Sequence, residues 1–535
     1  MLHGLRTSAA VSIALGLAFW LEIDNAYWAG TTAAIICQPV LGSSLRKALF
    51  RSLGTLVGAS AMVLLVACLP QDRVGFTIGL ASWCALCGFV GHRLTFFAAY
   101  GAQLAGYTAA IVAGDVLDHP DLTFNTVLAR VTGIEFGIAV ATLVLATTSR
   151  GGSRERLAAG FTALAADLLA SLKAPAPAGS AGSNLLRLSA LDIVIDQVTG
   201  EAAHWRLRLG PIRAAQNGLF NGLAHVQLLS TPGGQRLWQA LLPQRATQEE
   251  CRAAAAVLVS SPNREARKAG SAVAGIVIAL EVAAWLTAPD QPAPARGPAC
   301  PAPADPLPAL LTAGRVCIGV IVAAVIWMAT AWPSGPGAIT WVAILLLLMS
   351  PQQEQAFRAA SGFAAGTVLT AVLAVITKFA ILPQLQSFWG MSAALGLALI
   401  PLSALSTLTR LTFIFSPATV KFVPILAPAN QTDYDLTTFY NSALSIIVGC
   451  YLAVIALRVM APIPARIRTR RILAAAVAER SAVMAGTWRP TSDGWCDRMR
   501  THAASLPSSA DPANAEDMLI LYDQGLDAIR GREPR

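Results

Sequence analysis

The chain has 535 residues, of which 55% are hydrophobic and 13% are charged. Because about a quarter of the residues of soluble domains are charged, this composition excludes an ordinary soluble protein and indicates an integral membrane protein. The formal charge of +9 does not indicate nucleic acid binding, since the basic residues flank apolar runs and form no patch interleaved with aromatic residues.

Twelve apolar runs are predicted to cross the membrane as helices. The first run follows Arg6, but no small-residue cleavage site comes after it, so we expect a retained span and not a cleaved signal. The first six runs lie near 5–21, 26–42, 50–69, 74–91, 95–114 and 126–147. The second six lie near 314–332, 337–350, 360–380, 387–405, 408–427 and 438–460.

The charges of the connecting loops predict the orientation, because cytoplasmic loops carry an excess of Lys and Arg. With the N-terminus in the cytoplasm, the inner loops hold most of the basic residues: Arg46, Lys47, Arg51, Arg93, Arg150, Arg154, Arg156, Arg466, Arg468, Arg470 and Arg471. The outer loops hold mainly acidic residues: Glu22, Asp24, Asp72, Asp115, Asp118, Asp121, Asp433 and Asp435. Both termini are therefore predicted to be cytoplasmic.

The middle of the chain predicts a separate domain, because its sequence is more polar and rich in Ala and Leu. One run, 269–286, is apolar enough for a thirteenth span, but that would invert the second set of helices and place the basic cluster after 465 outside. We therefore interpret this run as a helix of the cytoplasmic domain. The predicted plan is a first membrane half (1–149), a cytoplasmic helical domain (150–286), a Pro-rich linker (287–310), a second membrane half (311–462) and a cytoplasmic C-terminal tail (463–535).

A weak internal repeat relates the two membrane halves. Four residues, Pro39, Arg46, Gly54 and Thr55, have counterparts 312 positions later in Pro351, Arg358, Gly366 and Thr367. Two such halves in the same orientation are typical of transporters with a path between them. The predicted fold is an all-α integral membrane protein with two six-helix transmembrane repeats in parallel orientation and an inserted cytoplasmic helical domain.

The repeated segment contains small residues and cations with different expected roles. Gly54-x-x-x-Gly58 and Gly362-x-x-x-Gly366 predict close packing of helix backbones. The cations are expected at the cytoplasmic boundary, where they either fix the orientation or contact an anion as it enters; they are Arg46, Lys47, Arg51 and Arg358.

Several short blocks occur in a characteristic order: AYWAGTTAAIICQP (26–39), Lys47-x-x-x-Arg51 with Gly54-Thr55, LAGYTAAI (104–111), WP-x-G (332–335) and FYNSALSIIVG (439–449). The chain thereby resembles the fusaric acid resistance and aromatic acid exporter family over 5–149 and 311–462. The resemblance implies an inner-membrane efflux pump of Gram-negative bacteria that uses the proton gradient to export aromatic carboxylic acids. It also implies a periplasmic membrane-fusion protein and an outer-membrane channel as partners, while a homo-oligomer stays open.

An exporter of aromatic carboxylates needs cations for the carboxylate and aromatic or amide groups for the ring. In the run 408–427, Arg410 and Lys421 are predicted to share one helical face about 16 Å apart, as a cationic stripe. The alternative is that both side chains extend to the membrane interfaces, with Lys421 reaching Asp433 or Asp435. Further substrate candidates are Tyr100, Gln103 and Tyr107 on one face of the fifth run, and Asn441 in the last run.

Glu135 is the candidate for proton coupling, because it falls near the middle of the sixth run and ionisable residues inside spans are costly and often functional. Arg130, which lies nearer the outer end of the same run and need not pair with Glu135, is the second candidate for proton coupling. The alternative for Glu135 is a structural hydrogen bond between helices.

These residues favour a proton-coupled exporter, with a passive organic-anion channel of related architecture as the alternative. A membrane enzyme is disfavoured, because the sequence has no P-loop, no His/Cys/Asp metal cluster and no Ser/His/Asp set at usable spacing. No cofactor and no metal are predicted.

Overall fold

The computed structural model describes most of the chain, and every regular element in that part is a helix. The described residues are 2–38, 40–69, 71–117, 120–148, 152–173, 180–201, 205, 208–229, 248–261, 264–288, 305–350, 355–385, 387–429, 434–507 and 509–531. The chain divides into two compact units. We call Met1–Arg150 with Asp305–Ile463 the membrane unit, and Gly151–Ala304 with Pro464–Arg535 the second unit.

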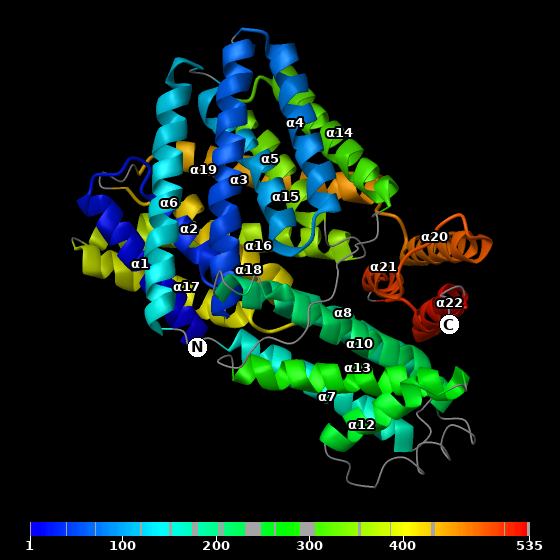
Figure 1. Cartoon of the computed structure of the whole chain (residues 1–535). Coiled ribbons are helices and arrows are strands. Elements are labelled where there is room, and N and C mark those ends of the chain that lie inside the picture. The colour runs from blue at the N-terminus through cyan, green and yellow to red at the C-terminus, as the bar shows by residue number, and fades with distance from the viewer. Residues whose placement is uncertain are drawn as a thin grey trace. The chain divides into compact units, whose positions relative to one another are not determined.

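Twelve α-helices, in two sets of six, make up the described residues of the membrane unit (Figure 1). The first set is α1 (Leu2–Trp20), α2 (Tyr27–Ile36), α3 (Leu41–Cys68), α4 (Arg73–Arg93), α5 (Phe96–Val116) and α6 (Thr123–Thr148). The second set is α14 (Pro306–Thr330), α15 (Gly335–Met349), α16 (Ala356–Val375), α17 (Phe388–Ser406), α18 (Thr412–Leu426) and α19 (Leu436–Val459). A π-helical turn (Ile376–Ile381) and a 3-10 turn (Leu382–Gln384) extend α16.

Twelve helices thus lie where the twelve runs were predicted, but not all of them are complete spans. In the described part of the chain nine helices are long and apolar enough to cross a membrane, and one of them, Ala266–Thr287, belongs to the second unit. The other eight are α3, α4, α5, α6, α14, α16 with its extension, α17 and α19. The length and hydropathy of a full span are therefore met at eight of the twelve predicted positions in the described residues, and not at α1, α2, α15 and α18.

Three of these helices are simply too short. Helix α2 has 10 residues and α15 and α18 have 15 each, so at about 1.5 Å per residue none of them spans about 30 Å of hydrocarbon. Their limits follow from the local sequence: a proline follows shortly after α2 and after α15, and α18 ends at Ala427 in the left-handed conformation. Nearly every residue of α15 is buried, so protein and not lipid surrounds this helix.

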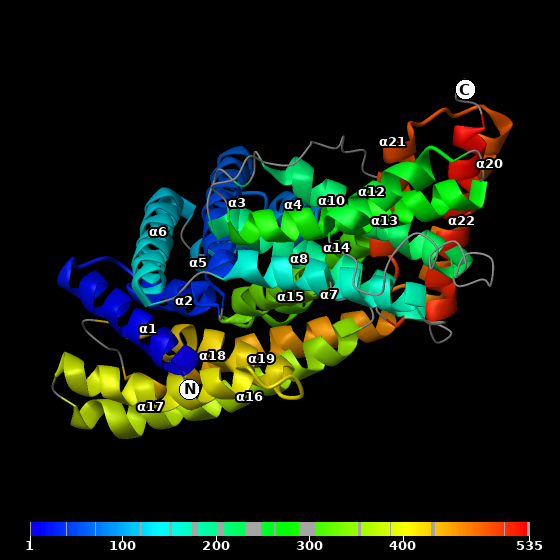
Figure 2. The same ribbon diagram turned by 60° about the horizontal axis from the view of Figure 1, so that its bottom comes forward.

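The two sets of helices pack in corresponding pairs. Helix α3 packs against α5 and α6, and α16 packs against α18 and α19. The first helix of each set, however, packs on the fourth helix of the other: α1 lies along α17 (Figure 2), and α14 lies along α4. The two sets are therefore interlocked.

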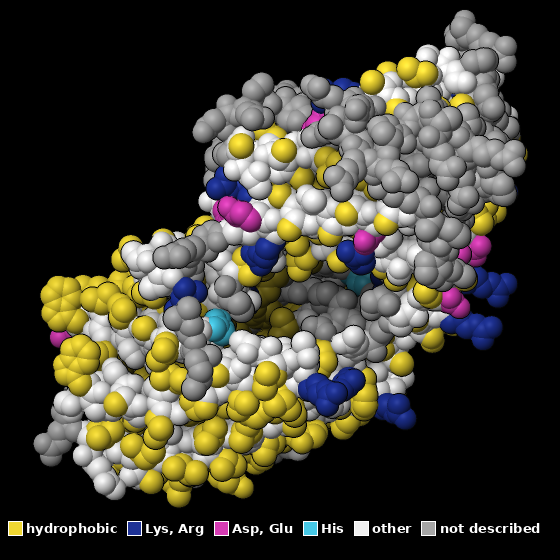
Figure 3. All heavy atoms as spheres, turned by 90° about the horizontal axis from the view of Figure 1, so that it is seen from below, with side chains coloured by type: hydrophobic (Ala, Val, Ile, Leu, Met, Phe, Trp, Pro, Cys, Tyr) yellow, Lys and Arg dark blue, Asp and Glu magenta, His cyan; other side chains and the backbone are white. Residues whose placement is uncertain are grey.

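Apolar side chains cover much of the membrane unit's outer surface, as its face in Figure 3 shows. Among them, Leu397 of α17, Val459 of α19 and Leu143 of α6 are each more than 60% exposed. A surface of this kind suits contact with lipid.

The second unit is a helical bundle formed by two distant parts of the chain. Its helices are α7 (Ser153–Lys173), α8 (Ser180–Glu201), α10 (Leu209–Leu229), α12 (Gln248–Val259), α13 (Arg264–Thr287), α20 (Ala465–Ala485), α21 (Ser492–Ala504) and α22 (Pro512–Arg530). Helix α13 contains the apolar run 269–286 and packs against α7, α10 and α12. Helices α21 and α22 pack against α8 and α10, and residues of α20, α21 and α22 belong to the same hydrophobic core as α7, α8, α10, α12 and α13.

Candidate functional site

The short helix α2 brings polar side chains of the first set together, because small residues let its neighbours approach closely. A Cβ on Gly137 of α6 would lie 2.5 Å from the carbonyl oxygen of Ala29, so these backbones are in contact. Gly54 and Gly58 of α3 meet the backbone of α5 in the same way, each with a carbonyl oxygen 2.4 Å from the added Cβ. The prediction that Gly54-x-x-x-Gly58 permits close helix packing is confirmed.

Arg51 lies at the centre of this arrangement. Its Nη1 donates to Tyr100 Oη on α5 at 3.0 Å, and its Nη2 donates to Thr32 Oγ1 on α2 at 3.2 Å. The residue is 3% exposed, and no described carboxylate lies within ion-pair distance of it. Arg51 lies three turns inside α3, which begins at Leu41, and its predicted place at the membrane boundary stays a prediction.

Two further groups complete the surroundings of Arg51. Tyr107 lies two turns along α5 from Tyr100, within hydrogen-bonding reach of its hydroxyl. Glu135 of α6 is close enough to interact electrostatically with Arg51, and its Oε1 is buried without a hydrogen-bond partner in the described structure. We call Thr32, Arg51, Tyr100, Tyr107 and Glu135 the arginine cluster.

Gln103 lies apart from this cluster, although it is on the same side of α5. Its side chain is 1% exposed and faces α4, where a Cβ on Gly91 would lie 2.9 Å from Gln103 Cγ. Within the described residues Gln103 Nε2 has no hydrogen-bond partner. An unpaired amide of this kind costs about 1–3 kcal/mol, so it suits contact with water or a ligand.

Arg130 forms a second cationic contact, at the other end of α2. Its guanidinium lies 3.7 Å from the centre of the Trp28 ring, and Nη1 pairs with Asp115 of α5 at 3.0 Å. The expectation that Arg130 need not pair with Glu135 agrees with this placement.

The remaining cations of the repeated segment lie on helices and not in a loop. Lys47 Nζ lies 5.6 Å from the centre of the Tyr100 ring, and the guanidinium of Arg46 lies 4.9 Å from the centre of the Phe50 ring. Arg358, at the start of α16, is exposed. The access role predicted for these residues stays a prediction.

Lys421 of α18 lies in the second set, in a position related to that of the arginine cluster. Its Nζ donates to Thr367 Oγ1 of α16 at 2.5 Å and to Cys450 Sγ of α19 at 3.1 Å. The same nitrogen lies 3.9 Å from the Trp341 ring centre and 4.1 Å from the Phe363 ring centre. The residue is 1% exposed. Its side chain therefore does not extend to the outer loop, contrary to the alternative interpretation.

The glycine contacts show why the two positions are related. A Cβ on Gly137 would meet Thr32 Cβ at 2.9 Å, and a Cβ on Gly449 of α19 would meet Trp341 Cβ at 2.8 Å. In the first set the residue at this place is Thr32, whose hydroxyl accepts from Arg51. In the second set it is Trp341, whose ring lies beside Lys421.

Arg410 does not share a helical face with Lys421. Helix α18 begins at Thr412, and Arg410 lies in the exposed turn before it. The predicted cationic stripe is therefore not formed; the turn precedes a helix that is shorter than the apolar run suggested. Asn441 is half-buried in the second turn of α19, and its role stays a prediction.

The sequence did not point to several residues that make these contacts. They are Thr32, Trp28, Asp115, Trp341, Phe363, Thr367 and Cys450 as side-chain partners of the buried cations. Thr367 did appear in the repeat, and Trp28 and Thr32 lie in the block AYWAGTTAAIICQP, so repetition and motif membership were the available signals.

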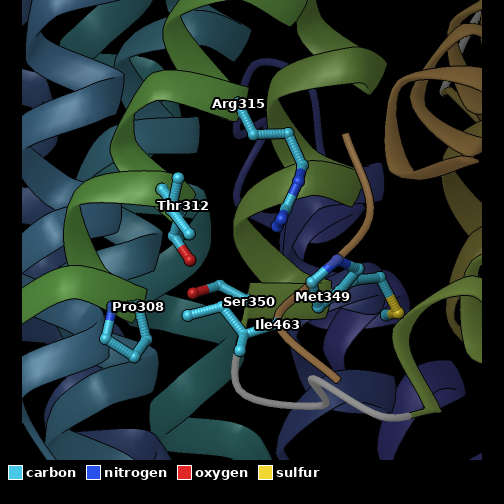
Figure 4. A pocket seen from close by; sticks show the side chains of 8 residues that line it. Pro308, Thr312, Arg315, Met349, Ser350 and Ile463 are labelled. Atoms are coloured by element: carbon cyan, nitrogen blue, oxygen red, sulfur yellow. The ribbon is translucent and has the colours of Figure 1, made fainter. Parts of the chain in front are cut away.

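A small pocket lies near the C-terminal end of α15 (Figure 4). Its lining includes Thr312, Arg315 and Ser350, and Arg315 Nε donates to the carbonyl oxygen of Met460 at 2.7 Å. Its volume of about 10 Å³ has room for a single water molecule. This pocket is too small for an aromatic acid.

Comparison with known proteins agrees with the resemblance in the motifs. The model of the fusaric acid resistance protein family matches residues 1–527. The uncharacterized transporter YdhK of Salmonella typhimurium is 26% identical over 521 residues, which cover 88% of this chain and 74% of that protein. The p-hydroxybenzoic acid efflux pump subunit AaeB of Musicola paradisiaca is 23% identical over 491 residues, covering 84% of this chain and 74% of that protein.

The corresponding AaeB subunit of Edwardsiella tarda is 22% identical over 508 residues, covering 84% of this chain and 75% of that protein. No solved structure matches the chain. Since the family model extends over nearly the whole sequence, and the membrane unit holds many apolar helices, this multi-pass membrane protein belongs to the fusaric acid resistance protein family.

Proposed function

We propose that the protein exports aromatic carboxylic acids of the fusaric acid or hydroxybenzoate type across the bacterial inner membrane, driven by the proton gradient. The observation that carries the proposal is Arg51, a buried cation that hydroxyl groups hold and that has no described carboxylate within ion-pair distance. A guanidinium stays charged and binds carboxylates in a bidentate fork. An arriving carboxylate would supply the missing counter-charge.

The other cations of the first set extend this site into a path. Lys47 lies one helical turn before Arg51 on α3, and Trp28, which contacts Arg130, lies one turn from Thr32 on α2. Each of these steps is about 6 Å along its helix. Rings accompany the cations, since Tyr100 lies beside Lys47 and Arg51 and Trp28 lies beside Arg130. A path of this kind suits an anion that carries an aromatic ring.

Glu135 is the proposed coupling group. Its Oε1 is buried and unpaired, and it interacts electrostatically with Arg51, so a change in its protonation alters the net charge of the substrate site. In the proposed cycle Glu135 takes up a proton from the outer side and releases it to the cytoplasm, while the acid moves outward.

The orientation, the repeats and the partners that we propose rest on the sequence and on the relatives. We propose that both termini are cytoplasmic, that the two sets of helices are parallel repeats, and that the second unit faces the cytoplasm. The relatives named as efflux pump subunits support the further proposal that a periplasmic membrane-fusion protein and an outer-membrane channel act with this chain.

Transport into inside-out membrane vesicles tests the proposal. The vesicles carry the protein, their lumen is acidic, and radiolabelled p-hydroxybenzoate or fusaric acid is added outside. A weak acid that crosses the bilayer by itself is depleted from an acidic lumen, so accumulation there requires the transporter. We expect accumulation that a protonophore abolishes and that vesicles without the protein do not show.

The same measurement separates the exporter from a passive anion channel. A channel would let the anion equilibrate with the membrane potential whether or not the pH gradient is present. Such equilibration, at equal luminal and external pH, would contradict proton-coupled export by this protein.

A further inference from the structure

We propose that Lys421 is a proton-carrying residue of the transport cycle, in the second set of helices, at the position that corresponds to the anion site of the first set. The inference rests on the proposed function in one respect, since the cycle it joins is that of the exporter. The geometry that supports it belongs to the second set alone.

The first support is the absence of a counter-ion. Lys421 is 1% exposed, and all of its polar contacts in the described structure are with uncharged groups: the hydroxyl of Thr367, the thiol of Cys450 and the rings of Trp341 and Phe363. No described carboxylate lies within 4.0 Å of its Nζ. The charge of Lys421 is therefore not fixed by an acidic partner, unlike that of Lys268, which contacts Asp523 and Asp527.

The second support is that the partners of Lys421 fit both protonation states. An ammonium group donates to Thr367 Oγ1 and Cys450 Sγ and lies over two rings, which stabilise a cation. A neutral amine has a lone pair, and the hydrogen of the Cys450 thiol can turn toward it, while the Thr367 hydroxyl donates to the carbonyl oxygen of Phe363 and goes on accepting from the amine. Both states are thus hydrogen-bonded, and a proton can leave without stranding a buried polar group.

The third support is the contrast with Arg51. An arginine cannot be deprotonated in a protein, so Arg51 is suited to bind an anion throughout the cycle. A lysine can change its charge. Compared with Arg51, Lys421 also has fewer N–H groups free to bind an anion, because its single nitrogen already donates to two uncharged groups. The two sets therefore place a permanent cation and a switchable one at related positions.

The titratable groups that face Lys421 are few. Helix α19 contributes Cys450, whereas α15 contributes the ring of Trp341 and α16 contributes the ring of Phe363 and the hydroxyl of Thr367. No described acidic side chain on α18 or on these neighbours forms an ion pair with it. A pH-dependent change at this place therefore belongs to Lys421 or to Cys450.

The helix that carries Lys421 also touches the anion site. Helix α18 packs against α2, and Phe422 of α18 shares a hydrophobic cluster with Ala29 and Ala33 of α2. Thr32, the partner of Arg51, lies on α2 between these alanines. A change at Lys421 that displaces α18 therefore reaches the helix that positions Arg51.

Trp341 fluorescence tests the protonation step without any substrate. The emission of the purified protein is titrated with pH in the wild type and in Trp341→Phe, and the difference isolates Trp341. We expect a pH-dependent transition that disappears in Lys421→Met and persists in Cys450→Ser. A transition that survives Lys421→Met, or no transition at all, would overturn the proposal.

Transport assays test whether this protonation drives the cycle. In Lys421→Arg the charge is permanent and in Lys421→Met it is absent, so both variants should lose proton-driven accumulation to the level seen with a protonophore. Exchange of labelled for unlabelled substrate needs no net proton movement and should continue. Wild-type accumulation by Lys421→Arg would show that a fixed cation suffices and would refute the proton-carrying role.

The two proposals can fail separately. If the wild type transports no aromatic acid, the proposed function fails, while the fluorescence transition still decides whether Lys421 changes protonation. If Lys421→Arg does not fold, Lys421→Met and the titration remain decisive, because methionine fills the volume of the lysine stem between the two rings.

Discussion

Arg51 Nη1 on α3 donates to Tyr100 Oη on α5 at 3.0 Å, and this hydrogen bond lies beside the place where Gly54 brings the two helix backbones into contact. The hydrogen bond is therefore not needed to hold α3 and α5 together, because their backbones are already in contact. Its effect is to fix the direction of the guanidinium, which leaves Nε without a partner in the described structure.

Replacing Arg51 by glutamine should reduce the affinity for aromatic carboxylates by tenfold or more, because a charge-assisted hydrogen bond contributes about 1.5–3 kcal/mol. Tyr100→Phe should cost less, since it leaves the cation in place. Binding of labelled p-hydroxybenzoate to the purified protein measures both effects.

Arg93, exposed at the end of α4, provides the matched control for the loss of one positive charge. We expect Arg93→Gln to bind like the wild type. Equal affinity of Arg51→Gln and Arg93→Gln would remove Arg51 from the binding site.

Glu135→Gln should abolish accumulation against the gradient while sparing binding and exchange, because glutamine keeps the shape of the side chain and cannot carry the proton. Asp24→Asn, in the exposed connection between α1 and α2, removes a carboxylate elsewhere and should have no effect. Uphill transport by Glu135→Gln in the vesicle assay would return this residue to a structural role.

Gly366→Ala should destabilise the membrane unit, since the added Cβ would lie 2.3 Å from the carbonyl oxygen of Ile414 and α16 would have to move away from α18. Overpacking of this kind costs about 1–3 kcal/mol. Gly314→Ala is the control, because nothing lies within 4 Å of its added Cβ. The midpoint of thermal unfolding in detergent should fall for the first variant only.

The second unit should lose stability on acidification because of a buried ion network. Desolvation lowers the pKa of His225, which the hydrogen bond to Asp523 only partly offsets. Burial by itself would raise the pKa of Asp523, but hydrogen bonds from His225 and Lys268 outweigh it and leave this pKa below its usual value.

Both shifts act in the same direction. A histidine with a lowered pKa contributes stability above its unfolded pKa of about 6.5, and that stability is lost as the pH falls toward the folded pKa. Asp523 adds a loss at lower pH, as its own folded pKa is approached. Hydrogen exchange of α10, α13 and α22 should therefore quicken as the pH is lowered through about 6, after correction for intrinsic rates, and His225→Gln should weaken this dependence. An unchanged pH dependence in the variant would contradict the assignment to His225.

The helices could be placed from the sequence because apolar runs bounded by charged loops have few alternatives in a membrane protein. Their completeness could not, since α15 and α18 are as apolar as the longer helices but have only 15 residues each. The depth of Arg51 within α3 could not be predicted for a related reason: α3 begins nine residues before the apolar run, and a cation inside a helix looks in sequence like one at its end.

The substrate and proton candidates show the same limit. Glu135 and Tyr100 could be selected because polar residues inside apolar runs are uncommon. The contacts of Lys421 could not be predicted, because its partners come from three other helices, 54 residues away at Thr367 and 29 away at Cys450. Sequence spacing relates residues within one helix and gives no information on such neighbours.

The packing of α1 on α17 and of α14 on α4 has a consequence for how access to the proposed site would alternate. Two separable halves could rock as rigid bodies, but here a helix of each half packs on the other half. A hinge motion between the halves would have to separate α1 from α17 and α14 from α4. In the proposed cycle we therefore expect opening and closing to be confined to the short inner helices. We also expect that a chain cut between the halves yields two fragments that must associate before either is completely packed.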